Sequence, residues 1–317
     1  MTTEAASKPA VTQRIDPVGV VAVLAASAFW GTSGIFVKFV TVAGEVSALA
    51  LAFWRDITAF AVLVTVLAIL RPAWLRVPRA KLPWLIAMGA CLGTFHVIWN
   101  LAVMLNGAAV ATVQQAGMPA IVAVVAWLLW GESLTWQKIM AILLTFAGTV
   151  LVSGLDALGD AELSLEGLLV GLATPIMYAA WTLCAKKARG DHNPMTTMTY
   201  AFGIGALVLL PLQFFTEQPF PVSNEAIMWF AAFIGISTVF SFPLYTWGLG
   251  RLPASVASIL VMSEIAFVAL YAMVLLDERL SGSQLLGAIL VIVGVLILSW
   301  RGRARRKESE APVAPPA

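Results

Sequence analysis

Long apolar stretches alternate with short polar loops along almost the whole chain. Each stretch holds roughly 18 to 24 residues, the length that an α-helix needs to cross a hydrocarbon core of about 30 Å. The pattern therefore predicts an all-α membrane protein with ten transmembrane helices, at residues 18–38, 46–70, 83–105, 109–130, 136–153, 164–187, 195–215, 226–248, 254–276 and 282–300.

The composition supports this prediction and excludes several classes of protein. Of 317 residues, 60% are hydrophobic and 11% are charged, whereas a soluble domain needs far more charged surface. The two cysteines, Cys91 and Cys184, lie inside apolar stretches and indicate neither a disulfide framework nor a metal site. The chain has no nucleotide-binding loop of the GxxxxGK[ST] type, so we expect no cofactor and no ATP-driven transport. We expect no nucleic-acid partner.

The basic residues indicate the orientation in the membrane. Most of the 19 Lys and Arg residues lie in alternate loops and at both ends, whereas the opposite loops are acidic. Because basic loops stay in the cytoplasm, both termini are predicted to be cytoplasmic, in the plasma (bacterial inner) membrane. Residues 1–17 form a cytoplasmic leader, and residues 301–317 form a basic, then Pro/Ala-rich tail that is expected to be disordered.

A shift of 146 residues places one half of the chain in register with the other. Under this shift, like residues coincide: Glu132 with Glu278, Leu134 with Leu280 and Gly148 with Gly294. The repeats are predicted at residues 18–155 and 164–300, with five helices in each. Five is odd, so the halves are inserted upside down relative to each other, an arrangement typical of transporters with a site near the midplane.

These features resemble the EamA-like family of the drug/metabolite transporter superfamily. The resemblance is carried by "FWGTSGIFVKF" in the first helix, by Arg55 in "LAFWRDITAF", and by a Glu-x-Leu corner after the fourth and ninth helices. It implies a ten-helix exporter or importer of metabolites, including amino acids. The family often carries a proline within both the fourth and ninth helices. This chain has Pro119 in the fourth but Ile265 in the ninth, so the ninth helix is expected to be straighter.

Glu264 is the leading candidate for a functional residue. It lies about ten residues from either end of the ninth predicted helix, near the bilayer midplane, where a carboxylate is costly and usually faces a cavity or a partner. Burial disfavours the charged form of a carboxyl group, so Glu264 is a candidate for proton coupling as well as for binding a substrate amine. The alternative is a protonated or paired structural residue.

Arg55 and Asp56 are neighbours in the second predicted helix. Adjacent helical residues point to different faces and need not pair with each other. Arg55 matches the arginine of the family and is interpreted as a structural partner for a carboxylate or a helix end. Asp56 is a second candidate for proton coupling, or else pairs with a basic residue elsewhere.

Several uncharged or aromatic side chains are candidates for substrate binding. His96 and Asn100 lie four residues apart on one helix face, with Trp99 beside them. The alternative is an interhelical hydrogen bond, worth about 0.6 to 2 kcal/mol. The remaining candidates face the same choice between cavity lining and packing: Gln115, Trp30, Tyr178 and Trp181.

Small residues recur at a spacing of seven in the fifth and tenth helices. Gly148 and Gly294 belong to this pattern, which permits close helix approach, and they are predicted to be structural, as is Pro119. The seam is expected to join the two halves or to lie within one half, and the chain is expected to be a monomer or a homodimer.

The sequence therefore favours a secondary transporter or facilitator that moves a small metabolite, such as an amino acid, and is not an enzyme. Export by alternating access is the favoured mode, with protons as a candidate coupling partner. Two alternatives stay open: a lipid-modifying intramembrane enzyme, which needs its acidic and His residues gathered at one depth, and a non-transporting membrane scaffold.

Overall fold

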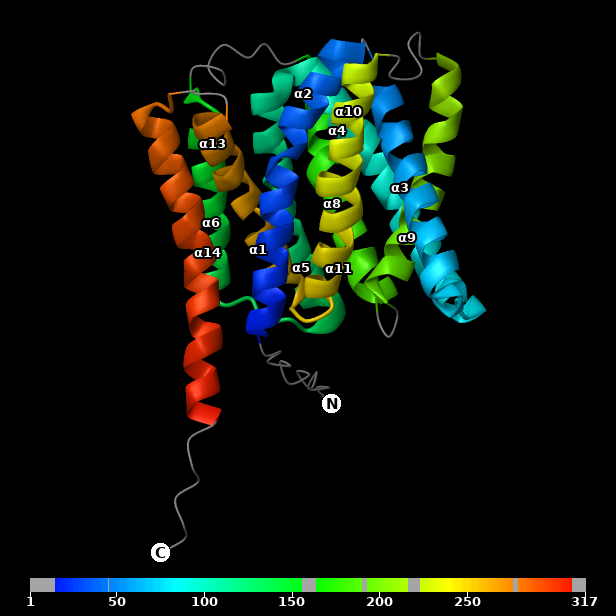
Figure 1. Cartoon of the computed structure of the whole chain (residues 1–317). Coiled ribbons are helices and arrows are strands. Elements are labelled where there is room, and N and C mark those ends of the chain that lie inside the picture. The colour runs from blue at the N-terminus through cyan, green and yellow to red at the C-terminus, as the bar shows by residue number, and fades with distance from the viewer. Residues whose placement is uncertain are drawn as a thin grey trace, which may run out of the picture.

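A computed structural model of the chain describes residues 15–44, 46–155, 164–189, 193–215, 223–275 and 279–309 (Figure 1). Within these ranges the ordered elements are helical. The α-helices are α1 (Pro17–Gly31), α2 (Ser33–Gly44), α3 (Ala48–Leu70), α4 (Leu82–Gln115), α5 (Met118–Trp130), α6 (Trp136–Val152), α8 (Leu165–Arg189), α9 (Pro194–Leu209), α10 (Asn224–Ile234), α11 (Ser241–Leu249), α12 (Ala254–Val261), α13 (Ser263–Leu275) and α14 (Gly282–Ser309). The short helices are η1 (Pro72–Leu75), η2 (Arg79–Lys81), η3 (Leu210–Phe215) and η4 (Gly235–Phe240).

Eight helical stretches of the described residues are long and apolar enough to cross a membrane. They are Pro17–Gly44, Leu49–Leu70, Arg79–Val103, Ala109–Trp130, Leu165–Arg189, Pro194–Phe215, Asn224–Arg251 and Ala254–Val274. Two further apolar helices, Trp136–Val152 and Gly282–Leu298, are shorter. The prediction of an all-helical, multi-pass membrane protein is confirmed, whereas ten crossings in two inverted repeats stay a prediction. The Glu278 corner and the acidic positions 156, 160 and 162 lie outside the described residues.

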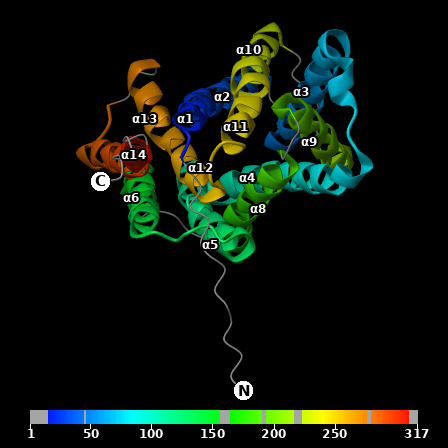
Figure 2. The ribbon, with the colours of Figure 1, turned by 90° about the horizontal axis from the view of Figure 1, so that it is seen from below.

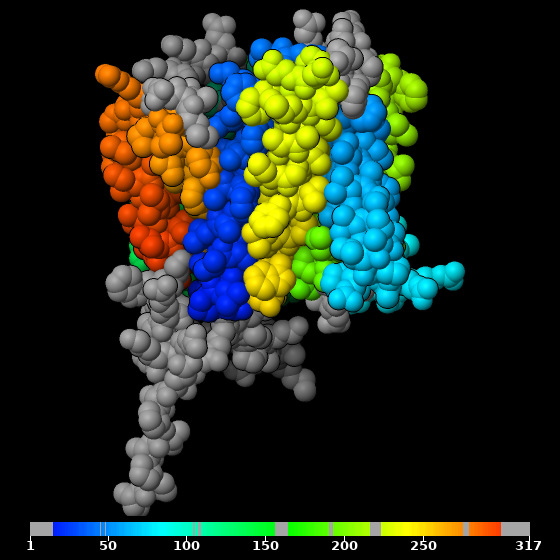
Figure 3. Space-filling model, viewed as in Figure 1, coloured from blue at the N-terminus to red at the C-terminus, as the bar shows by residue number. Residues whose placement is uncertain are grey.

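The helices from the two sides of segment 156–163 interleave. α4 packs most extensively against α8, α6 packs against α14, and α3 packs against α9. Seen along the helices in Figure 2, α6 and α14 form one end of the molecule and α3 and α9 the other, with α1 and α11 between them. In Figure 3, the same order runs across one face, from α14 through α1 and α10 to α3. Residues 17–154 and 165–300 therefore share one core.

The contact between α6 and α14 depends on glycines. A Cβ atom added at Gly148 would lie 2.6 Å from the carbonyl oxygen of Gly287, and a Cβ atom at Gly287 would lie 2.6 Å from that of Gly148. Further along, Gly294 faces Thr145, with 3.0 Å from its added Cβ to the Thr145 methyl. Gly148 and Gly294 thus lie in a small-residue seam between α6 and α14 within one chain.

Two predicted spans are interrupted near their middles. α4 continues to Gln115, through the gap predicted at 106–108, and the break falls at residues 116–117, just before Pro119 in the first turn of α5. The ninth span breaks at Met262, between α12 and α13. The prediction of a straighter ninth helix is therefore wrong. Ser263 and Glu264 open α13 without a proline, because a carboxylate is stabilised at a helix N-terminus. Residues 116 and 262 differ by the 146-residue shift.

The eighth span carries a third irregularity. Between α10 and α11, residues Gly235–Phe240 form the π-helical turn η4. Pro243 follows it and has no N–H to bond the carbonyl of residue 239, which explains the local change of winding. The Thr238 hydroxyl donates to the Phe233 carbonyl at 3.1 Å.

The first span also breaks, at Thr32, whose hydroxyl lies 2.8 Å from that of Ser237 in the π turn.

Side-chain contacts join the helices at the end where α1 begins and α14 ends (Figure 1). Glu132 accepts hydrogen bonds from the backbone N–H of Ala254 at 2.7 Å and from that of Ser255 at 3.2 Å, so it caps α12. Lys138 donates to the Ser255 hydroxyl at 2.6 Å and lies 3.7 Å from Glu132. Lys186 donates to the Leu249 carbonyl at 2.8 Å. We call Glu132, Lys138, Lys186 and Ser255 the Glu132 network.

Candidate functional site

Arg55 is held by the π turn of the eighth span. Its Nε donates to the Thr238 hydroxyl at 3.2 Å. The guanidinium carbon lies 4.8 Å from the ring centre of Phe233 and 5.1 Å from that of Phe242. Cation–π contacts and one directional hydrogen bond fix the plane of the guanidinium. Arg55 as a whole is half-buried.

Glu264 lies in the first turn of α13, directly after the Met262 break. Arg55 and Glu264 interact electrostatically, and Tyr178 of α8 interacts with both. Glu264 is half-buried, and its carboxyl group forms no hydrogen bond with a residue that the structure describes. A carboxylate at the start of a half-helix is favoured by the helix dipole. The structure therefore places a carboxyl group of α13 and a guanidinium of α3 close enough to interact electrostatically.

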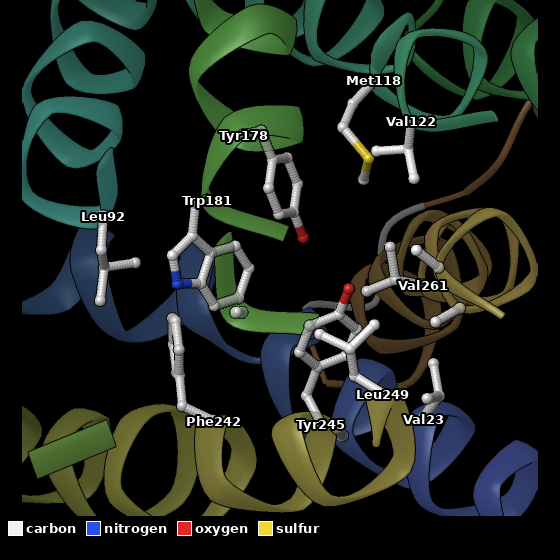
Figure 4. Packing of buried hydrophobic residues seen from close by; sticks show 14 of the residues in the cluster. Val23, Leu92, Met118, Val122, Tyr178, Trp181, Phe242, Tyr245, Leu249 and Val261 are labelled. Atoms are coloured by element: carbon white, nitrogen blue, oxygen red, sulfur yellow. The ribbon is translucent and has the colours of Figure 1, made fainter. Parts of the chain in front are cut away.

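A cluster of aromatic side chains adjoins Arg55 through Phe242. The Trp30 ring lies 4.7 Å from that of Phe242 and 5.0 Å from that of Tyr245, and Trp181 stacks on Tyr245 at 5.5 Å. Figure 4 shows the hydroxyl ends of Tyr178 and Tyr245 directed toward one another, from α8 and α11, with Trp181 between Leu92 and Phe242. Three of the predicted candidates, Trp30, Tyr178 and Trp181, are thus brought together.

Two of these aromatic residues carry unused hydrogen-bond donors. The indole N–H groups of Trp30 and Trp181 are buried and have no acceptor among the described residues. A buried donor without a partner costs free energy and commonly marks a place where a ligand or water binds.

His96 pairs with a carboxylate, and its role as a substrate contact stays a prediction. Its Nδ1 lies 3.0 Å from Oδ1 of Asp56, and both side chains are buried. The His96 ring also meets the Phe242 ring edge-on at 6.2 Å, so the pair adjoins the aromatic cluster. Asp56 therefore pairs with a basic residue elsewhere, the alternative that the sequence left open.

Three further predicted residues, Trp99, Asn100 and Gln115, lie in α4 and are half-buried. Gln114, the neighbour of Gln115, accepts a hydrogen bond at 3.0 Å from Asn106 of the same helix, and Asn106 also donates to the Gly167 carbonyl of α8 at 2.7 Å. Pro119 is buried beside the 116–117 break.

Sequence reasoning missed Phe233, Thr238, Phe242 and Tyr245. The one signal that pointed to them was Pro243, since a proline inside an apolar span forces an irregular turn. No group of His, Cys, Asp and Glu that could hold a metal ion occurs in the described parts of the chain.

The long apolar helices define the class to which the chain belongs, the multi-pass helical membrane proteins. Comparison with known proteins identifies the family within this class. The chain belongs to the EamA-like transporter family, whose model matches residues 17–154 and again residues 165–300.

Named relatives are transporters. The uncharacterized transporter YwfM of Bacillus subtilis (strain 168) is 28% identical over 295 residues, covering 91% of this chain and 96% of YwfM. A probable terminal-alkyne amino-acid exporter of Streptantibioticus cattleyicolor is 26% identical over 248 residues, covering 76% of this chain and 81% of the exporter. A solved structure, described as a crystal structure of a protein, aligns with a TM-score of 0.77 at 19% identity, over 90% of this chain and 98% of that chain, and is similar in fold. These names point to transporters rather than enzymes.

Proposed function

We propose that this protein is a secondary transporter that exports a small zwitterionic metabolite, of the amino-acid type, across the plasma membrane. In this proposal both termini are cytoplasmic, and the substrate binds at Arg55 and Glu264. Its carboxylate bonds the outer nitrogens of Arg55, its amine bonds Glu264, and the aromatic cluster contacts its side chain.

One observation carries the proposal: Arg55 is held in place by Thr238 and two aromatic rings inside the membrane-spanning helices, and the half-buried carboxyl group of Glu264 acts on it from the first turn of α13. Charges at this depth are expensive unless they are paired or reach a water-filled space. Glu264 has no hydrogen bond from a described residue, and Arg55 uses one nitrogen on Thr238. A ligand with one negative and one positive group would satisfy both residues.

The relatives support the same class of substrate. One of them is named as a probable exporter of an amino acid. Broken helices whose half-helix ends meet substrate near the midplane are typical of secondary transporters. Breaks at residues 116–117 and at Met262, separated by the 146-residue shift, also favour two inverted repeats that exchange conformations by alternating access.

The proposal is tested with purified protein in proteoliposomes. A panel of radiolabelled amino acids is loaded inside, and counterflow is measured with and without a pH gradient. We expect at least one zwitterionic amino acid to exchange, and the matched amine and carboxylic acid, each with one charge only, to compete weakly.

Glu264→Gln separates the role of charge from that of shape. The amide keeps the size of the side chain but cannot titrate or hold a second charge. We expect the variant to insert normally and to lose amino-acid counterflow, together with its pH dependence. Wild-type rates and pH dependence in Glu264→Gln, at matched protein level, would show that the carboxyl group is structural.

A further inference from the structure

Asp56 and His96 form a second ionisable pair that the proposed substrate site does not use. Asp56 lies on α3 and His96 on α4, with relative exposures of 0% and 5%. Apart from their mutual contact at 3.0 Å, neither the two carboxylate oxygens nor the two ring nitrogens have a hydrogen-bond partner among the described residues. This pair is therefore isolated from other polar groups.

α9 closes over the pair. A Cβ atom added at Gly205 would lie 2.6 Å from Oδ2 of Asp56, so only a glycine allows α9 to come this close. α4 reaches the same point through Gly93, whose added Cβ would lie 2.7 Å from the Gly205 carbonyl oxygen. The backbones of α4 and α9 thus pack closely beside the pair.

The surroundings contain one other charge that acts on His96, namely Arg55, the chain neighbour of Asp56. Glu264 acts on Arg55 from α13, and Tyr178 lies beyond it on α8. The rings of Phe95 and Phe242 flank His96 at 5.8 and 6.2 Å, and α9 presents Gly205. Thr238 and Phe242, the groups of the eighth span near this point, carry no charge.

The energy of burying charge favours one titratable proton on the pair, in addition to the N–H that a neutral imidazole always carries. With one proton, the pair is neutral overall, whether it is an ionised Asp56 beside a charged His96 or a protonated Asp56 beside a neutral ring. Without that proton, an ionised Asp56 stays in an apolar place beside a neutral ring, with no positive charge on His96 to balance it, which is costly. With a second proton, a net positive charge adjoins Arg55.

We propose that Asp56 and His96 together bind one proton, at a site separate from Arg55 and Glu264. Adjacent residues of a helix point about 100° apart, so α3 presents Arg55 to the substrate and Asp56 to His96. When α3 moves relative to α4 and α9, water reaches the pair. The N–H bond at Nδ1 of His96 then breaks, the proton passes to water, and ionised Asp56 with neutral His96 remains until a proton from the other side restores the pair.

This inference rests on the proposed transport function for its role, but the site can be tested without any substrate. The chain has two histidines, His96 and His192, so His192→Gln leaves one imidazole. In 15N-histidine-labelled protein in lipid vesicles, we expect His96 to show a ring nitrogen that shares a proton with a carboxylate from pH 5 to 8. Adding Asp56→Asn should convert it to a neutral ring. The same His96 spectrum with and without Asp56 would overturn the proposal.

A second experiment measures protons moved per substrate molecule, with a pH-sensitive dye inside proteoliposomes during net amino-acid efflux into a substrate-free medium, because counterflow exchanges substrate for substrate and moves no net protons. The double variant Asp56→Asn/His96→Gln removes both ionisable groups and leaves no lone buried charge. Its proton movement per substrate should fall to near zero, whereas Asp16→Asn, which removes the carboxylate that contacts Arg251 at 3.5 Å, should leave the ratio unchanged.

An unchanged ratio in the double variant would overturn the proposal. If the wild-type protein exchanged none of the amino acids, the proposed function would fail, and the 15N spectra would decide the proton site alone.

Discussion

Arg55 differs from most charged side chains in that its orientation, as well as its charge, is fixed by neighbours. The Thr238 hydroxyl accepts from Nε, and Phe233 and Phe242 contact the guanidinium. A lysine at this position would keep the charge, but it has neither the planar group nor the Nε donor. The orientation of the Arg55 guanidinium thus depends on the π turn at Gly235–Phe240, which contains Thr238.

Arg55→Lys is therefore expected to weaken amino-acid counterflow strongly, with the apparent affinity reduced by about tenfold or more, while protein yield is preserved. Thr238→Val is the matched comparison, because it keeps the size of the side chain and the charge of Arg55 but removes the acceptor for Nε, together with the hydrogen bond to the Phe233 carbonyl. One hydrogen bond corresponds to a loss of roughly 2- to 10-fold in affinity. Counterflow by Arg55→Lys at the wild-type affinity would contradict a role in orienting substrate.

Candidate residues differ in how far the sequence alone could reveal them. Asp56 and Glu264 stand out because a charge inside an apolar run is rare and costly. Phe233 and Phe242 do not stand out, because the chain has 16 phenylalanines and an aromatic ring in an apolar run carries little information. Their role arises only when the eighth span is folded against Arg55. For the same reason, the sequence could propose His96 as a candidate but not its pairing with Asp56.

At the scale of single elements, the Glu132 network is the most specific feature. Glu132 follows α5 and caps the first turn of α12, so one carboxylate connects two helices that are far apart in sequence. The side chains of Lys138 and Glu132 have relative exposures of 9% and 2%. A buried pair of this kind is disrupted more by losing one member than by losing both.

Glu132→Ala is expected to destabilise the protein by about 3 to 5 kcal/mol, since it leaves Lys138 without its counter-charge and α12 without its cap. The double variant Glu132→Ala/Lys138→Met should recover part of this loss. Denaturation in detergent, monitored by circular dichroism, measures both. Equal stability of the single and double variants would show that the charge pair contributes nothing beyond the cap.

Helix positions were largely accessible from the sequence, whereas interruptions within helices were not. The length of an apolar stretch locates a span, and a proline inside it, such as Pro243 in the eighth, indicates an irregular turn. The break at Met262 has no such signal in the sequence, because Ser263 and Glu264 rather than a proline follow it at the start of α13. Helix α4 likewise continues through the loop predicted at 106–108, because a few polar residues in the sequence locate a loop only approximately.

At the scale of the whole molecule, the positions of the chain ends bear on how the protein is oriented in the membrane. α1 begins and α14 ends at the same end of the molecule (Figure 1), as an even number of crossings requires. Which side of the membrane this end faces is a prediction from the basic residues, and the inverted repeat requires that Ser153 and Ser309 face opposite sides.

Single cysteines at positions 153 and 309 test that requirement, in a background with Cys91 and Cys184 replaced by alanine. An impermeant maleimide added to whole cells should label Ser153→Cys, and Ser309→Cys should react only after the membrane is permeabilised. Labelling of both positions from the same side would rule out the inverted repeat, whatever the substrate is.

The paired breaks at residues 116–117 and at Met262 bear on how such a chain evolves. The family model matches residues 17–154 and 165–300, and each match contains one of these two breaks. In the first match a proline follows the break, and in the second a carboxyl group does. After a duplication, a bend that packing already maintains no longer depends on the residue that first caused it. That position is then free to mutate, and the second copy can acquire new chemistry without losing its shape.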